Sequence, residues 1–103
     1  MTNKETLIKA RALIKKGWTQ KYYVKDKDGK HLDIPFAGGE PEGATCYCVL
    51  GAIFAAAGWG HQGQDCKILI RDILDGSITG WNDHPSRTQA EVLSLFDRAI
   101  QEA

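Results

Sequence analysis

Three cysteines and a histidine in the middle of the chain are of the types that bind zinc: Cys46, Cys48, His61 and Cys66. Their spacing argues against a metal site. Cys46 and Cys48 do not form the paired Cys-x-x-Cys arrangement of a zinc knuckle, and in a helix their side chains would point about 200° apart. We therefore expect no metal and no other cofactor. The odd number of cysteines is typical of reduced thiols rather than of a disulfide framework.

Cys48 could act instead as a nucleophile. It falls in the first turn of a predicted helix, where unpaired N–H groups and the helix dipole lower the pKa of a thiol. A histidine would serve as the base, and Asn82 or Asp83 would orient it, which is the layout of a thiol-dependent hydrolase or transferase. The sequence leaves open which histidine would lie close; the candidates are His31, His61 and His84.

A dense polar segment from Trp81 to Thr88 is the third place where chemistry could occur. Asn82 and Asp83 can fold back onto the backbone in Asx turns, and Asp83 can pair with Arg87. One interpretation is a loop that braces the last helix, with Trp81 filling the core. The other is a recognition loop in which Arg87 clamps an anion or carboxylate. The candidate binding residues are Trp81, Asn82, Asp83, Arg87 and Thr88.

Charge is unevenly distributed along a chain whose net charge is zero. Residues 1–30 contain nine of the 13 Lys and Arg residues but only three of the 13 acidic ones. Such asymmetry can mark a nucleic-acid-binding face, with Tyr22 and Tyr23 stacking on bases. The alternative, which we favour, is that two oppositely charged parts pack beside each other in one domain. The basic residues in question are Lys4, Lys9, Arg11, Lys15, Lys16 and Lys21.

Local signals predict the elements that position the N-terminal residues. A Thr-x-x-Glu capping box at residues 2–5 opens a helix that we expect to end at Lys16. Residues 20–25 and 31–34 favour strands because they are rich in aromatic and branched side chains. The Asp-Gly pair between these two segments predicts a tight turn, so we expect them to form a β-hairpin.

The middle of the chain predicts two helices. Residues 46–57 are apolar on every side, which is typical of a buried central helix, and Thr45 is a suitable N-cap for it. Gly51 weakens such a helix, so we expect another backbone to cross there. A further helix is predicted over 66–75, with Asp65 as its cap.

The C-terminal part predicts a loop and a helix. Residues 77–86 are interpreted as a compact loop, and the last helix follows it, opened by a capping box between Thr88 and Glu91. The apolar residues of that helix recur at intervals of three and four. We expect Trp81 to be largely buried. We also expect Arg87 to lie against the Asn-Asp pair that follows Trp81.

Together these elements predict a helix-dominated α+β fold in one domain over residues 1–103, with about four helices packed around a buried central helix and one β-hairpin. Hydrophobic residues make up 43% of the chain and charged residues 25%, which is typical of a globular protein rather than a disordered one. No segment approaches the roughly 20 apolar residues of a membrane helix. The opening residues lack the apolar core of a signal peptide, so we expect a cytoplasmic protein.

Two patterns stand out along the chain. One is Cys-x-x-Gly-Ala, which starts at Cys48, and the other is Trp-Asn-Asp, Arg-Thr and Glu-Val over residues 81–92. Together they resemble a family of small uncharacterised proteins of bacteria and their phages. The resemblance covers the C-terminal two-thirds of the chain, and the Gly17-Trp18 pair also fits the family's opening. It implies no reaction, but the phage link implies an accessory or host-interaction role. The positions that it marks are Cys48, Asn82, Asp83, Arg87 and Thr88.

From these observations we expect a non-enzymatic interaction or accessory protein, such as a phage-encoded protein that acts on a host protein. Its partner would then be a protein, with no involvement of a membrane. One alternative is a thiol-dependent enzyme that uses Cys48. The other is nucleic-acid binding by the basic N-terminal third. The sequence specifies neither the substrate nor the oligomeric state.

Overall fold

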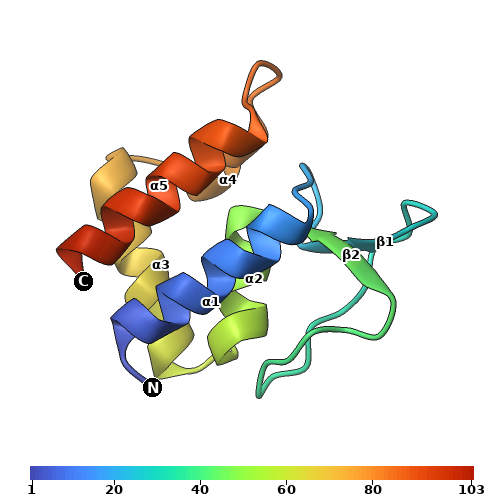
Figure 1. Cartoon of the computed structure of the whole chain (residues 1–103), viewed down its shortest axis with the longest axis horizontal. Coiled ribbons are helices and arrows are strands. Elements are labelled where there is room, and N and C mark those ends of the chain that lie inside the picture. Colours follow the sequence, from blue (N-terminus) through green and yellow to red (C-terminus); the bar gives the residue numbers. More distant parts are fainter.

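The computed structural model describes all 103 residues, and its core is built around one short apolar helix (Figure 1). In α2 (Val49–Ala57), eight of the nine residues are buried, because helices cover it on several sides. Helices α1 (Asn3–Lys16) and α3 (His61–Leu74) pack against α2, and α5 (Gln89–Glu102) lies along α1. The predicted buried central helix is confirmed, and so is the helix-dominated α+β class.

A fifth helix, α4 (Ile78–Asn82), lies where the sequence indicated only a loop over 77–86. The side chain of Ser77 caps it by accepting a hydrogen bond from the N–H of Gly80 at 3.0 Å. Its buried residues, Ile78 and Asn82, hold this single turn against the core. A short helix of this kind gives almost no periodic signal, and it depends on its cap and on burial.

The two strands pair differently from the prediction. Strand β1 (Val24–Asp26) pairs antiparallel with β2 (Ala44–Tyr47), and not with residues 31–34, which contribute only an isolated bridge. The turn expected after β1 does form. The chosen pairing places Val24 opposite Tyr47, and both side chains are completely buried. The burial of this facing pair therefore determines which segment pairs with β1, and that segment lies outside the predicted hairpin.

Strand β2 occupies residues that were expected to open the central helix. Helix α2 consequently begins three residues later than predicted, and Cys48, not Thr45, is its N-cap. The expectation for Gly51 is confirmed. A Cβ atom at Gly51 would lie 1.9 Å from the carbonyl oxygen of Tyr23, because the chain leading into β1 crosses α2 there.

Helix α3 begins at His61, five residues before the predicted start, with Gly60 rather than Asp65 as its N-cap. It includes Gly63, which lies outside the helix predicted over 66–75. A Cβ atom at Gly63 would lie 2.1 Å from the carbonyl oxygen of Gly58, so only glycine lets the start of α3 pack this close to the end of α2.

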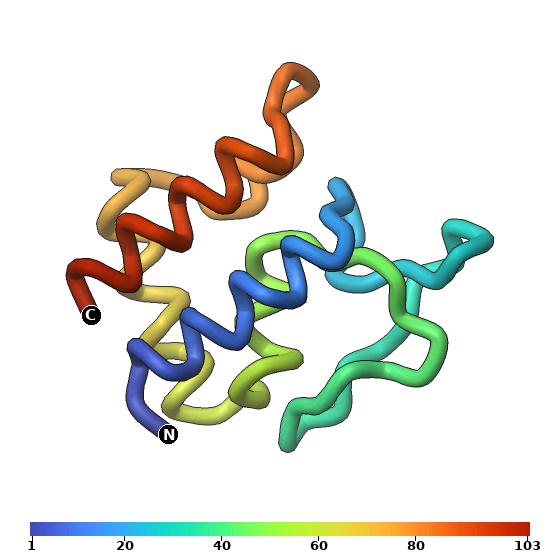
Figure 2. Tube along the Cα trace, viewed as in Figure 1, coloured from blue at the N-terminus to red at the C-terminus, as the bar shows by residue number.

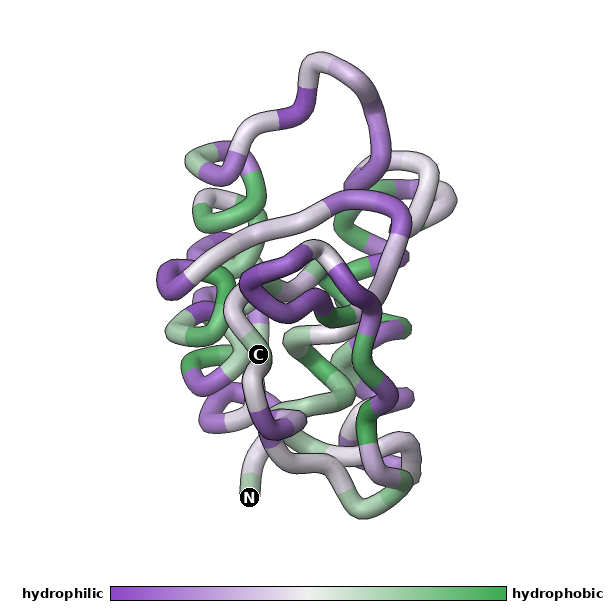
Figure 3. Tube along the Cα trace, turned by 90° about the vertical axis from the view of Figure 1, so that its right-hand side faces the viewer, coloured by the Kyte–Doolittle hydropathy of each residue, from purple (hydrophilic) through white to green (hydrophobic).

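The chain trace places both termini at one end of the molecule and the two-stranded sheet at the other (Figure 2). The molecule measures 35 × 32 × 19 Å. Viewed from the side of the sheet, hydrophobic residues concentrate in the helices, whereas the loop between α4 and α5 at the top is mostly hydrophilic (Figure 3). None of the helices combines the length and apolar character needed to cross a lipid bilayer.

Candidate functional site

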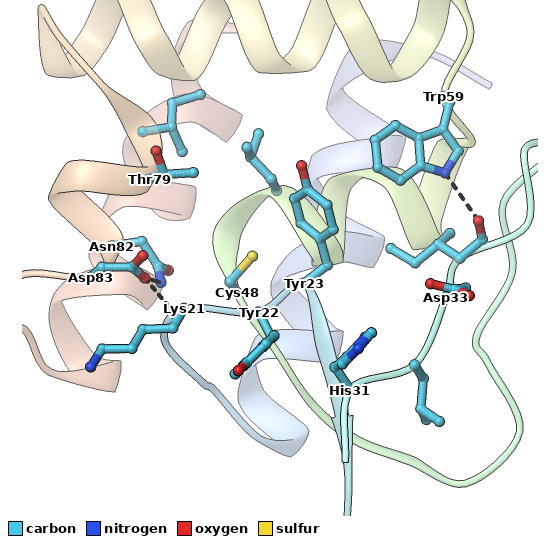
Figure 4. Close-up of a pocket in the computed structure, with 14 residues that line it drawn as sticks. Lys21, Tyr22, Tyr23, His31, Asp33, Cys48, Trp59, Thr79, Asn82 and Asp83 are labelled. Atoms are coloured by element: carbon cyan, nitrogen blue, oxygen red, sulfur yellow. Dashed lines mark hydrogen bonds between the residues drawn. The ribbon is translucent and has the colours of Figure 1, made fainter. Parts of the chain in front are cut away.

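A cavity of about 660 Å³ opens between the chain that leads into β1, residues 31–34, and α4 (Figure 4). The N-terminal end of α2 contributes its floor through Cys48 and Leu50. Its volume lies in the range of ligand-binding pockets, roughly 300–1,000 Å³. The cavity is therefore the feature of this fold that is best suited to hold another molecule.

Cys48 lies on the floor of the cavity, but its environment does not suit a nucleophile. Its side chain is only 6% exposed, and its Sγ accepts a hydrogen bond from the N–H of Gly51 at 3.2 Å. Burial raises the pKa of the Cys48 thiol to about 11, and the hydrogen bonds from the helix N-terminus only partly oppose this effect. The expectation that the helix N-terminus would lower this pKa is wrong, because desolvation of the thiolate outweighs the dipole.

Of the three candidate bases, only His31 lines the cavity together with Cys48. Its ring stacks on that of Tyr22, with centroids 5.4 Å apart, and makes no hydrogen bond to the thiol. His61 is exposed at the start of α3, and His84 bonds through its ring Nδ1 to the hydroxyl of Ser86 at 2.8 Å. The structure thus brings a cysteine and a histidine to one cavity without connecting them.

Asn82 is the most heavily bonded side chain at this site. Its Oδ1 accepts hydrogen bonds from the indole of Trp18 at 2.9 Å and from the N–H of Val49 at 3.1 Å. Its Nδ2 donates to the carbonyl of Thr19 at 3.2 Å and to Asp83 at 2.9 Å. With only 2% of its surface exposed, Asn82 has no hydrogen-bonding capacity left for a ligand. It holds the site together.

Asp83 differs from its neighbour because half of its carboxylate is free. Its Oδ1 accepts hydrogen bonds from the N–H of Lys21 at 2.8 Å and from Asn82. Lys21 has a φ of 74°, which a non-glycine residue rarely adopts, and the bond to Asp83 helps to hold it there. The other oxygen, Oδ2, makes no hydrogen bond within the chain.

The remaining candidate binding residues face a different part of the surface. The guanidinium of Arg87 lies over the ring of Trp81, 3.9 Å from its centroid, and its Nε donates to the Trp81 carbonyl at 2.8 Å. Its other partner is Glu91, in an ion pair of 3.1 Å. Arg87 therefore does not pair with Asp83, because the ring and Glu91 already engage it. Trp81 is half-buried, not largely buried as expected.

The predicted capping box of the last helix is confirmed. The side chain of Thr88 accepts from the N–H of Glu91 at 3.3 Å, and Glu91 accepts from the N–H of Thr88 at 3.0 Å. This backbone hydrogen bond is the main reason why the pKa of the Glu91 carboxyl is lowered. Thr88 thus has a structural role at the start of α5.

Aromatic side chains that the sequence did not assign to one site form a wall of the cavity. Trp59 stacks on Phe54 with centroids 4.1 Å apart, and the ring of Tyr23 meets Trp59 edge-on at 5.4 Å. The indole N–H of Trp59 donates to the carbonyl of Ile34 at 3.2 Å, which fixes the ring in place (Figure 4). Trp59 was missed because Tyr23 and Ile34 are remote from it in sequence, and Asp33 was missed because it joins the site only when residues 31–34 fold against the same cavity.

The cysteines do not gather as zinc ligands would. Cys46 lies on β2, Cys48 at the start of α2, and Cys66 is buried in α3 with its Sγ 3.8 Å from the carbonyl oxygen of Asn3. No group of three or more His, Cys, Asp or Glu side chains lies close enough to hold a metal ion.

A comparison with protein families finds a match. The model of a family of unknown function matches residues 1–102. The chain belongs to DUF6197. The expectation of an uncharacterised family is confirmed, and the match extends from the C-terminal two-thirds to the basic N-terminal third. No solved structure matches this DUF6197 chain.

In the DUF6197 chain, the basic N-terminal third contacts acidic residues of the remainder. Arg11 pairs with Asp97 of α5 at 2.7 Å, and Lys16 pairs with Glu40 at 2.9 Å. These pairs agree with the interpretation that oppositely charged parts pack together. Tyr22 and Tyr23, the proposed base-stacking residues, lie at the cavity.

Proposed function

We propose that this protein acts by binding another protein, without catalysis, and that a segment of the partner inserts into the cavity. The observation that carries the proposal is a preformed cavity with a fixed aromatic wall, surrounded by further exposed aromatic side chains. Sites of this kind offer an apolar surface that a partner can cover at little cost in conformational entropy.

The rim of the cavity supports a protein as the partner. Tyr22 is 48% exposed, Tyr23 is 42% exposed, and Phe36 is 77% exposed. Phe36 adjoins the cavity wall, since its carbonyl accepts the backbone N–H of Trp59 at 2.9 Å. Aromatic residues are enriched at the centres of protein interfaces, where they contribute much of the binding energy. A partner that covers this rim would remove three large apolar side chains from water.

The state of Cys48 favours binding over a thiol-dependent reaction. A thiol whose pKa is raised by burial to about 11 carries very little thiolate at neutral pH. No histidine is hydrogen-bonded to it, so a base that could remove its proton is not in place. Its observed contact, with the N–H of Gly51, is that of an N-cap.

We further propose an accessory role in the cytoplasm of a bacterial or phage-infected cell, with a host protein as the partner. What supports this origin is the resemblance of the patterns at Cys48 and at residues 81–92 to small proteins of bacteria and phages. The basic N-terminal third supports nucleic-acid binding less well, because two of its side chains are engaged in ion pairs.

A peptide library tests the proposal directly. The full chain would be immobilised and used to select binders from random dodecapeptides displayed on phage. A large side chain would then be placed in the cavity mouth with Thr79→Trp, since Thr79 is an exposed lining residue on α4. We expect the selected peptides to bind this variant roughly tenfold more weakly or worse, because the new side chain occupies their site.

The matched control is Gln101→Trp, which adds the same side chain at an exposed position near the end of α5. It should bind the selected peptides as the unmodified chain does. The proposal fails if no peptides are selected, or if those selected bind both tryptophan variants equally well.

A further inference from the structure

Two carboxylates, Asp33 and Asp83, are among the polar side chains that line the cavity. Asp33 and Asp83 lie on opposite sides of it, and neither carboxylate takes part in any of the four ion pairs of the molecule (Figure 4). Asp33 makes no side-chain hydrogen bond, and Oδ2 of Asp83 is also free. The one lysine among the lining residues, Lys21, extends its amine away from the middle of the cavity, and the ring of His31 is stacked on Tyr22 (Figure 4).

The groups that would attract an anion are already engaged. Helix α2 begins at the floor of the cavity, and the free N–H groups of a helix start commonly bind anions. Here the N–H of Val49 donates to Asn82, and the N–H of Gly51 donates to Cys48. A negatively charged ligand would therefore meet two carboxylates and find these donors occupied.

The aromatic wall adds a surface that suits a cation. One face of Trp59 is covered by Phe54, and its indole N–H is bonded to Ile34, so the ring is held rigidly at the cavity. Tyr23 stands edge-on beside it. The face of an aromatic ring attracts ammonium and guanidinium groups, and the attraction is stronger the more these groups are desolvated.

We infer that the cavity accepts a positively charged side chain of the partner, and an arginine in preference to a lysine. This inference rests on the proposed function, because it names the group that the partner inserts. A guanidinium is planar, stacks on aromatic rings and can donate two parallel hydrogen bonds to the carboxylate of Asp33 or one to the free Oδ2 of Asp83. The cavity presents both kinds of acceptor, a fixed aromatic wall and free carboxylate oxygens. A purely apolar side chain would instead desolvate the carboxylates without compensation.

Nuclear magnetic resonance titrations of the ¹⁵N-labelled chain test the inference with two small probes. The first is N-acetyl-arginine methylamide, and the second is the corresponding citrulline derivative, which has nearly the same shape without the charge. The indole N–H of Trp59 reports on the cavity, whereas that of Trp81 reports on the other side of α4. We expect the arginine probe to shift the Trp59 signal in a saturable way and to leave Trp81 unchanged. The lysine analogue should bind more weakly, and the citrulline analogue should bind weakest.

Two isosteric substitutions test whether the two carboxylates bind the arginine probe. Asp83→Asn keeps the oxygen that accepts from Lys21, and Asp33→Asn changes an exposed residue without internal hydrogen bonds, so both variants should fold. Each should weaken binding of the arginine probe roughly tenfold, since each removes a hydrogen bond between two charged groups. The control is Asp72→Asn, which changes the net charge equally on the exposed side of α3 and should leave binding unchanged.

Equal binding of the arginine and citrulline probes overturns the inference, and so does an arginine effect on Trp81 instead of Trp59. Undiminished binding by both cavity variants also overturns it. The peptide selection separates this failure from that of the proposed function. One outcome is that the selected peptides require an open cavity and yet contain no arginine or lysine that contributes to binding. In that case the cavity binds a protein segment as proposed, but the inference that it accepts a cationic side chain is wrong.

Discussion

Asn82 joins three parts of the chain that lie far apart in sequence. Through its four hydrogen bonds it connects the segment after α1, the first residue of α2, and α4 itself. Beyond its neighbour Asp83, its side chain forms hydrogen bonds with Trp18, Thr19 and Val49. Since the same contacts fix the floor and one side of the cavity, a single amide positions the candidate site.

Replacing Asn82 with alanine should therefore destabilise the fold strongly. The change leaves the N–H of Val49 and the indole N–H of Trp18 without acceptors, and each buried unsatisfied donor costs about 1–3 kcal/mol. We expect the free energy of unfolding in urea to fall by roughly 3–5 kcal/mol. The control is Gln89→Ala, which removes one hydrogen bond from a side-chain amide to the carbonyl of Ile14 and should cost much less. Similar losses in the two variants would contradict this account.

The sequence could identify Asn82 as important but not explain why. Local rules predict an Asx turn for an asparagine that precedes an aspartate, and a recognition role was the alternative. The actual partners of the side chain are 33 to 64 positions away, apart from Asp83. Cys48 shows the same limitation, because its position in the first turn predicts a lowered pKa, whereas its burial, which raises the pKa, depends on the whole fold.

At the level of elements, the crossing of the chain over α2 constrains one residue above all. Gly51 lies in the first turn of the most apolar helix, where alanine would ordinarily be favoured by up to about 1 kcal/mol. A methyl group at this position would lie 1.9 Å from the carbonyl oxygen of Tyr23, which belongs to the backbone and cannot rotate away. This close contact positions the chain that leads into β1, which forms one side of the cavity.

Gly51→Ala should destabilise the protein by about 3 kcal/mol despite the better helix propensity, because the steric overlap must displace α2 or the crossing chain. The matched substitution is Gly76→Ala, whose added methyl group meets nothing within 4 Å. Urea unfolding of both variants decides the point. A stabilised Gly51→Ala variant would show that the two backbones do not approach as closely as described.

Elements that depend on neighbouring residues were predicted well, and elements that depend on distant ones were not. Both capping boxes, at Thr2 with Glu5 and at Thr88 with Glu91, form as the sequence indicates. The partner of β1 could not be predicted, because residues 31–34 and 44–47 both contain residues that suit a strand. Only the burial of Tyr47 against the helices distinguishes them.

On the scale of the whole molecule, the core contains three weak acids that are neutral at physiological pH. Burial is the main cause that raises the pKa of Cys48 and of Cys66 to about 11 and that of Tyr47 to about 12. Each of these groups is buried in the same continuous core of 22 hydrophobic residues. Their ionisation is therefore coupled to the stability of the entire fold.

This coupling predicts a loss of stability in alkaline solution. In the unfolded chain the Cys48 thiol ionises near its ordinary pKa of 9, whereas in the folded protein it keeps its proton up to about pH 11. Between these values the folded state binds more protons than the unfolded state, so the free energy of unfolding decreases as the pH rises. Below about pH 9 this group has no effect. Two pKa units correspond to roughly 2–3 kcal/mol for Cys48 alone. The measurement is urea unfolding between about pH 9 and pH 11 for the unmodified chain and for Cys48→Ser. The serine hydroxyl can cap α2 but does not titrate in this pH range. The decline should be shallower in the variant. Equal slopes would mean that the thiol ionises as readily in the folded state as in the unfolded one, which would restore Cys48 as a candidate nucleophile.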